Sequence, residues 1–263
     1  MDAVFIIIYF IFGTIMASFF HVVATRLSTG QSIISPPSHC TYCNHKLSWY
    51  ELIPIVSYIV FKGKCHHCHH RLPVSYLLVE IITGILYAVS YHVFGLTLQG
   101  LISLIFISTL ITVIISDIEY MIILDEVLIT GVILIIITMI FSIGLFPTFE
   151  HIGYGCLAFL TMYAVKLVGD ALFKKESLGG GDIKLMFLFG LVLGYPISVL
   201  TIFLATFIAF PIAIYVLFSS KDNLIPFGPF LCMSAILMNI SGVTFTEIIN
   251  FIIQIWQNRE NMV

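Results

Sequence analysis

The sequence carries very little charge. Only 10% of its 263 residues are charged, whereas a soluble domain carries about a quarter. With a hydrophobic content of 60%, this scarcity excludes an ordinary soluble globular protein. Apolar runs of about 18 residues, long enough to cross a bilayer, recur along the chain. We therefore expect an all-α polytopic membrane protein, because helices satisfy their own backbone hydrogen bonds in lipid.

Other features are absent as well. There is no stripe of basic and aromatic residues, so we expect no nucleic-acid partner, and the lipid bilayer is the partner that the composition predicts. The segment from Met1 to Phe20 has no basic start and no small-residue cleavage site, so it is expected to remain as the first helix. No inverted repeat is visible, which argues against a transporter with a proton relay.

The apolar runs predict about eight transmembrane helices, with a small cytoplasmic domain between the first and the second. Turns are expected at Gly95–Thr97, Phe146–Thr148 and Gly194–Pro196, where glycine or proline interrupts a run. The expected division is a first helix over residues 1–25, a polar domain over 26–73 and a bundle over 74–263. The spans are expected near residues 4–24, 74–94, 98–115, 127–145, 152–173, 183–193, 196–218 and from 229 on. The last span is expected to break at residues 239–242. Residues 245–256 either complete this span or lie in the membrane interface.

The positive charges predict the orientation, because cytoplasmic loops are enriched in Lys and Arg. Nearly all of them fall in loops on one side, and only Arg259 lies opposite. That side is expected to be the cytoplasm, with both termini outside, and it holds the acidic and glycine-rich loops. The basic residues on it are Arg26, Lys46, Lys62, Lys64, Arg71, Lys166, Lys174, Lys175, Lys184 and Lys221.

Two Cys-x-x-Cys pairs lie in the first loop, Cys40 with Cys43 and Cys65 with Cys68. About 20 residues separate the pairs, close to the usual spacing of paired zinc knuckles. In a reducing cytoplasm this pattern favours a structural zinc ion over two disulfides. Four thiolates leave no open position for water, so we expect no catalysis at this metal.

A carboxylate follows three glycines at Gly179-Gly180-Gly181-Asp182, directly before an apolar run. A charge so close to lipid is costly, so we interpret Asp182 as half of an aspartyl protease pair. The alternative is a helix N-cap, where Asp is favoured and the helix dipole stabilises its charge. Capping does not explain three glycines, whose bare backbone would let an extended peptide lie beside the carboxylate.

The partner of Asp182 is expected among Asp117, Glu119, Asp125 and Glu126, which follow the third span. In such a pair the ionised carboxylate takes a proton from water while the protonated one polarises the peptide carbonyl. On a helix Asp117 and Asp125 would lie about 12 Å apart, so only one of them can be the partner. Asp117 comes directly off the apolar span, which favours it, but periodicity alone does not choose. The alternative for the cluster is a solvated acidic loop.

Two features have no single interpretation from the residues alone. Pro226-Phe227-Gly228 interrupts helix formation before the last span and is either a plain loop or part of a site. Glu80 lies inside the second span, where a charge is costly, so it is expected to face the bundle interior or a partner. A structural contact and a functional role fit Glu80 equally well.

Together these motifs resemble the type IV prepilin peptidases, GxGD-type aspartyl proteases of the bacterial inner membrane. The resemblance covers nearly the whole chain, with His21 where asparagine is usual and Leu124 where proline is usual. It implies that Asp117 and Asp182 are catalytic and that Asp125 lies outside the pair. The segments that carry it are 13–23, 36–54, 63–68, 77–80, 179–185 and 226–230.

The resemblance implies an endopeptidase that removes the basic leader of type IV prepilins or pseudopilins after a glycine, on the cytoplasmic side. Some members also N-methylate the new N-terminus with S-adenosylmethionine, and some serve competence systems. The alternative function is a zinc-knuckle binding or assembly protein with structural carboxylates. The residues expected at the substrate site are Gly179, Gly180, Gly181, Pro226, Phe227 and Gly228.

Overall fold

The structure is a computed structural model that describes residues 2–176, 178–219 and 226–243, together with 246, 247, 250 and 254. Within these residues the chain is helical, apart from loops and two isolated β-bridges in the cysteine-bearing segment. The expected all-α fold is thereby confirmed. The chain divides into two compact units, residues 1–143 and 144–263, which are described one at a time.

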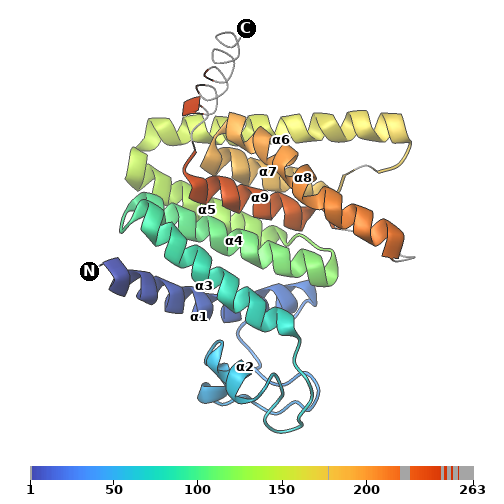
Figure 1. The fold of residues 1–263 in the computed structure, drawn as a ribbon. Coiled ribbons are helices and arrows are strands. Elements are labelled where there is room, and N and C mark those ends of the chain that lie inside the picture. The colour runs from blue at the N-terminus through green and yellow to red at the C-terminus, as the bar shows by residue number, and fades with distance from the viewer. Residues whose placement is uncertain are drawn as a thin grey trace. The chain divides into compact units, whose positions relative to one another are not determined.

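The first unit is built around α4, most of whose residues are buried. This helix lies between α3 and α5 (Figure 1). Helices α1, α3 and α5 pack against it. Between α1 and α3 lies a loop-rich segment, residues 29–73, which we call the connecting domain. The elements in chain order are α1 (Asp2–Ser28), the 3-10 helix η1 (Trp49–Leu52), α2 (Val56–Val60), α3 (Val74–Phe94), α4 (Leu98–Tyr120) and α5 (Asp125–Ile143).

Small residues allow the helices of this unit to approach closely. A Cβ added to Gly13 of α1 would lie 2.9 Å from the Cα of Gly84 in α3. A Cβ added to Gly131 of α5 would collide with the hydroxyl of Thr109 in α4. Such contacts are typical of helix interfaces in membranes, where van der Waals packing has to replace the hydrophobic effect.

The second unit is built around α7, which packs against α6, α8 and α9. Its side chains Leu185, Leu188 and Phe189 are fully buried. A Cβ added to Gly190 would lie 2.5 Å from the carbonyl oxygen of Tyr154, so α6 and α7 touch through their backbones. The elements are α6 (Leu145–Phe173), α7 (Gly180–Leu193), α8 (Tyr195–Ser219) and α9 (Gly228–Ser241).

Each of the predicted spans corresponds to a helix. Six helices of the described part, α1, α3, α4, α5, α6 and α8, are long and apolar enough to cross a membrane. Helices α7 and α9 have 14 residues each, about 21 Å, which is less than the hydrocarbon thickness of about 30 Å. The stretch 245–256, predicted after the last break, lies mostly outside the described residues.

Two predicted boundaries are wrong. The turn expected at Phe146–Thr148 lies at Gly144, which has a φ of +89°, and Pro147 sits in the first turn of α6. Proline is tolerated there because the first backbone N–H groups of a helix have no partner within it. The third span continues beyond Ile115 to Tyr120, so Asp117 lies inside α4. The break at Gly194 is confirmed, with a φ of +78° between α7 and α8.

Candidate functional site

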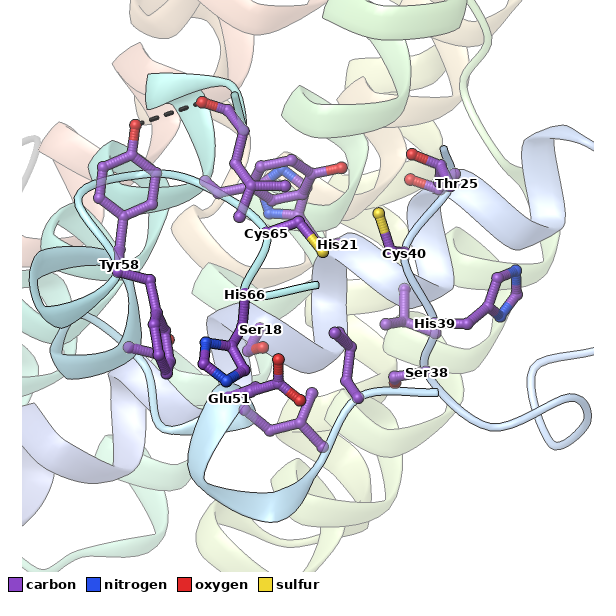
Figure 2. Close-up of a pocket in the computed structure, with 18 of the residues that line it drawn as sticks. Ser18, His21, Thr25, Ser38, His39, Cys40, Glu51, Tyr58, Cys65 and His66 are labelled. Atoms are coloured by element: carbon purple, nitrogen blue, oxygen red, sulfur yellow. Dashed lines mark hydrogen bonds between the residues drawn. The ribbon is translucent and has the colours of Figure 1, made fainter. Parts of the chain in front are cut away.

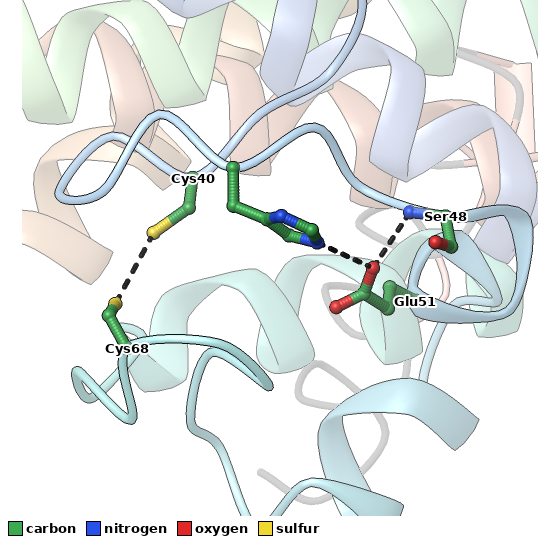
Figure 3. Close-up of polar contacts among 5 residues, drawn as sticks. Cys40, Ser48, Glu51 and Cys68 are labelled. Carbon is green, nitrogen blue, oxygen red and sulfur yellow. Dashed lines mark hydrogen bonds and ion pairs between the residues drawn. The ribbon is translucent and has the colours of Figure 1, made fainter.

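The four paired cysteines of the connecting domain come together in one cluster. Their sulfur atoms all lie within 4.8 Å of one another, and Cys40 Sγ is 3.9 Å from Cys68 Sγ (Figure 3). Four sulfurs at about 2.3 Å from a central zinc ion would be about 3.8 Å apart. The cluster therefore fits a tetrahedral zinc ion, with Cys40, Cys43, Cys65 and Cys68 as the ligands.

The two halves of this cluster are structural repeats. Cys40 N–H donates to the carbonyl of His45, and Cys65 N–H donates to that of His70. In each half the residue after the second cysteine is left-handed, Asn44 at φ +55° and His69 at φ +57°. The repeat is encoded in the sequence, because both halves have the pattern Cys-x-x-Cys-x-His-Lys/Arg-Leu. The spacing of the cysteines alone does not reveal it.

The backbone of the first half also lowers the pKa of the Cys40 thiol. Burial alone would raise the pKa of the Cys40 thiol, but the backbone N–H groups of Tyr42 and Cys43 and the neighbouring sulfurs lower this pKa to about 7. The thiolate is the form of cysteine that binds metal. The pKa of the Cys43 thiol moves the other way: the backbone N–H of His45 lowers it, but burial and the hydrogen bonds with the neighbouring sulfurs raise it to about 12, so the backbone favours the thiolate at Cys40 alone.

Of the four acidic candidates in the first unit, Asp117 is the buried one. Its side chain lies in the last turn of α4 and is 6% exposed. Asp125 and Glu126 begin α5 and are exposed, while Glu119 faces His21 of α1, with 3.7 Å between Oε1 and Nε2. Burial therefore favours Asp117 over Asp125 as the candidate partner of Asp182, a choice that periodicity could not make.

In the second unit Asp182 lies in the first turn of α7, 7% exposed. The helix begins at Gly180 and its N-cap is Gly179, so Asp182 is the third helical residue and not the cap itself. Gly179 has an extended backbone, whereas Gly180 and Gly181 are helical. Gly179 therefore precedes the helix, while Gly180 and Gly181 lie within its first turn.

The Pro226–Gly228 segment leads into α9. Phe227 is the N-cap of this helix, Gly228 its first residue, and Pro229 occupies the first turn, where proline is tolerated. Gly228 and Pro229 are buried in the second unit. The segment is thus a packed helix start, and Asp182 and α9 both belong to this unit.

A cavity of about 280 Å³ lies in the first unit between the connecting domain and the helices α1 and α3 (Figure 2). Two carboxylates, Glu51 and Glu80, line it together with His21, Tyr58 and Tyr76. Cys40 and Cys65 border the same cavity, so it reaches the cysteine cluster. Its lining is mostly apolar, with these titratable side chains set into it at the base of the connecting domain, and sequence spacing gave no sign of it.

Comparisons with known proteins agree with the motifs. Residues 11–94 match the family model of the bacterial peptidase A24 N-terminal domain, and residues 104–214 match that of the type IV leader peptidase family. A prepilin leader peptidase/N-methyltransferase of Bacillus subtilis (strain 168) is 33% identical over 253 residues, covering 94% of this chain and 97% of that protein. The chain belongs to the type IV leader peptidase family.

Two further relatives carry the same name, prepilin leader peptidase/N-methyltransferase. One from Vibrio cholerae is 26% identical over 92% of this chain and 98% of its own length. One from Myxococcus xanthus is 31% identical, over 71% of this chain and 55% of its own length. No solved structure matches the chain. Membership confirms that the chain is a peptidase, and together with the six long apolar helices of the described residues it indicates a multi-pass bacterial membrane protein.

Glu80, whose role the sequence left open, makes a structural contact in this leader peptidase. Its Oε2 accepts a hydrogen bond from the backbone N–H of Ile55 at 2.7 Å. Ile55 has a φ of +62°, which a β-branched residue rarely adopts. Glu80 thereby ties a strained point of the connecting domain to α3.

Arg26 makes the matching contact on α1, and the sequence analysis missed it. Its Nη1 donates to the carbonyl oxygens of Ser32 and Ile33, each at 3.1 Å. The side chain is 7% exposed although it carries a full charge. Counting Arg26 only as a cytoplasmic charge hid this role, because nothing local in the sequence marks a contact with the following loop.

Proposed function

We propose that this leader peptidase is an aspartyl endopeptidase that removes the basic leader of type IV prepilins or pseudopilins after a glycine, at the cytoplasmic face of the membrane. Curated relatives are named prepilin leader peptidases, which supports this substrate class. The observation that carries the mechanism is that Asp117 and Asp182 are both buried carboxylates at helix ends. A buried carboxylate is costly and indicates function.

The two aspartates lie at opposite ends of their helices. Asp182 lies in the first turn of α7, where the positive end of the helix dipole stabilises a negative charge. Asp117 lies in the last turn of α4, where the negative end of the dipole opposes such a charge. We therefore assign Asp182 as the carboxylate that takes a proton from water, and Asp117 as the acid that polarises the peptide carbonyl.

The proposed substrate site includes the start of α7 and the start of α9. A Cβ added to Gly179 would lie 3.5 Å from Asp182 Oδ2, so the bare backbone leaves room directly beside the carboxylate. A Cβ on Gly180 would meet nothing within 4 Å. The open side of these residues suits a leader peptide lying extended against Asp182. The residues assigned to this site are Gly179, Gly180, Gly181, Pro226, Phe227 and Gly228.

Zinc is assigned a structural role in the connecting domain. The four cysteines close a tetrahedral site, so no position remains for a reacting water. Zinc bound there would hold the two knuckles together, and the chemistry of peptide cleavage would be left to the aspartates.

A second activity, N-methylation of the new N-terminus, is favoured by the cavity beside the cysteine cluster. The curated relatives carry N-methyltransferase in their names. S-adenosylmethionine, when bound, supplies a methyl group from a sulfonium cation, and carboxylates and aromatic rings stabilise cations. Glu51, Glu80, Tyr58 and Tyr76 provide these groups in the cavity. Equilibrium dialysis with labelled S-adenosylmethionine in the absence of prepilin, comparing the natural chain with Tyr76→Ala, measures this binding without relying on catalysis, and we expect the variant to bind more weakly.

The peptidase proposal is tested by Asp117→Asn and Asp182→Asn in proteoliposomes with a purified prepilin. We expect each change to abolish leader cleavage, because an amide can neither accept the proton nor share one. Asp125→Asn is the matched control, since Asp125 is exposed, and it should retain substantial activity.

Cleavage that survives Asp117→Asn or Asp182→Asn in a protein of unchanged zinc content would overturn the dyad. If, instead, both variants behaved normally in cells while cysteine substitutions abolished function, the alternative of a zinc-knuckle assembly protein would replace the peptidase proposal. Zinc content and size-exclusion profile of each variant report whether it has folded.

A further inference from the structure

The connecting domain leaves most of its large apolar side chains exposed, while Leu47, Ile55, Tyr58, Phe61 and Leu72 are half-buried. Only Cys40 and Cys65 of its hydrophobic residues are buried. Trp49 is 77% exposed and Ile34 is 93% exposed. In a domain surrounded by water, side chains of this size are usually placed inside, so their exposure indicates an interaction surface. We call the following residues the apolar set: Ile34, Trp49, Ile53, Val56, Ile59 and Val60.

Part of the apolar set is continuous with the lipid-facing side of α1. A hollow of about 510 Å³ is lined by Ile34, Trp49 and Ile53 of the connecting domain. Ile15 and Phe19 of α1 line the same hollow, and both are about half exposed on this membrane-spanning helix. Apolar side chains of the helix and of the domain therefore share one hollow, whose lining also includes Ser18, Arg26 and Ser38.

Two polar contacts hold the domain down at the level of the helices. Arg26 of α1 binds the carbonyls of Ser32 and Ile33, directly before Ile34. Glu80 of α3 binds the N–H of Ile55, between Ile53 and Val56. Helix α3 has 21 residues, about 31 Å, which matches the hydrocarbon thickness of a bilayer. Glu80 lies about 9 Å from the start of that helix, so Ile55 is held well inside its length.

We propose that the connecting domain lies in the bilayer surface, with the apolar set among lipid acyl chains and one phospholipid chain occupying the hollow beside α1. Tryptophan favours this interfacial layer, and Val56, Ile59 and Val60 form one side of the short helix α2. Exposed Lys46, Lys62 and Arg71 complement anionic headgroups while their stems cover apolar surface. Lipid is the occupant because the hollow is lined by exposed apolar side chains, Ile15 and Phe19, of a helix long and apolar enough to cross a membrane.

The chain has two tryptophans, which makes the proposal directly measurable. In Trp256→Phe, Trp49 is the only tryptophan, and the protein is reconstituted in phosphatidylcholine bilayers with bromine on the acyl chains. We expect about a twofold or greater loss of Trp49 emission, larger for bromine near the headgroup than at mid-chain, since tryptophan sits at the interface. The double variant Trp49→Phe, Trp256→Phe gives the background signal.

A second variant tests the hollow itself. Ile34→Asp in the Trp256→Phe protein places a charge among the apolar set and should reduce the quenching of Trp49 while zinc content stays unchanged. Trp49 emission that brominated lipid leaves unquenched would overturn the proposal. A peptide that carries the apolar segment of a prepilin provides a further test. If this peptide reversed the quenching of Trp49, the proposal would also be overturned, because the hollow would then be a peptide site.

Discussion

The connecting domain and helix α4 belong to the same compact unit but are stabilised in different ways. Most of α4 is buried, and its side chains Phe106, Ile107 and Leu110 are fully enclosed. The connecting domain encloses only two of its cysteines among its hydrophobic residues. It is held by a few discrete contacts: the sulfur cluster, the hydrogen bonds of Arg26 and that of Glu80.

This difference predicts how each region responds to substitution. Distributed packing loses stability in proportion to the volume removed, because neighbouring side chains relax only partially. A domain held by discrete contacts loses a whole segment when one contact is removed. Asp117 lies at the end of the well-packed helix α4, so damage to the connecting domain should leave its immediate surroundings intact.

The largest effect is expected for Cys65→Ser. One missing thiolate opens the tetrahedral site, and structural zinc contributes about 10 kcal/mol or more to folding in small zinc domains. Both knuckles should unfold, with loss of zinc measured by atomic absorption and rapid proteolysis within residues 29–73. Cys156→Ser is the matched control, since Cys156 is exposed on α6 and should keep the zinc. A Cys65→Ser protein that retains zinc and protease resistance would contradict this account.

A smaller, graded effect is expected for Leu110→Ala in α4. The side chain is fully buried, so its truncation should cost about 2–5 kcal/mol of unfolding free energy. Leu101→Ala on the same helix removes the same atoms from a side chain that is 45% exposed and should cost much less. Unfolding in mixed detergent micelles measures both, and zinc content should stay unchanged. Equal losses for the two variants would show that α4 is not the core of this unit.

The features that could be predicted from the sequence were those encoded locally. The spacing of the cysteine pairs predicts a metal site, and the length of the apolar runs predicts the membrane spans. Gly194 marks a break because a φ of +78° requires glycine. These signals depend on a few neighbouring residues, so no knowledge of the folded chain was needed.

The features that could not be predicted are those for which the local sequence allows two structures and does not favour either of them. Pro147 can end a helix or occupy its first turn, and only the fold chose the second. Hydropathy ended the third span at Ile115 although the helix continues through Asp117. The contact between Glu80 and Ile55 joins residues distant in the sequence, which no periodicity reveals. The pairing of Asp117 with Asp182 stays a prediction for the same reason.

An intermediate effect is expected for Glu80→Ala. Removing the acceptor leaves the N–H of Ile55 without its partner, which costs about 1–2 kcal/mol for a partly buried group. The amide of Ile55 should therefore exchange its hydrogen about 5- to 30-fold faster, as measured by mass spectrometry of peptides over residues 53–60. Glu80→Gln keeps an acceptor oxygen and should exchange close to the natural rate. If Glu80→Ala leaves this exchange unchanged, the contact does not hold the domain.

The smallest effect is expected for Thr97→Ala at the start of α4. The Thr97 hydroxyl accepts a hydrogen bond from the backbone N–H of Gly100 at 3.0 Å, and losing such an N-cap costs about 1 kcal/mol. Thr97→Ser keeps the hydroxyl and serves as the control. The loss should appear as faster exchange in the first turn of α4, with zinc binding untouched because the cap lies outside the connecting domain. A Thr97→Ala protein that loses zinc would mean that the two regions are coupled, and the contrast between discrete and distributed stabilisation would then not hold.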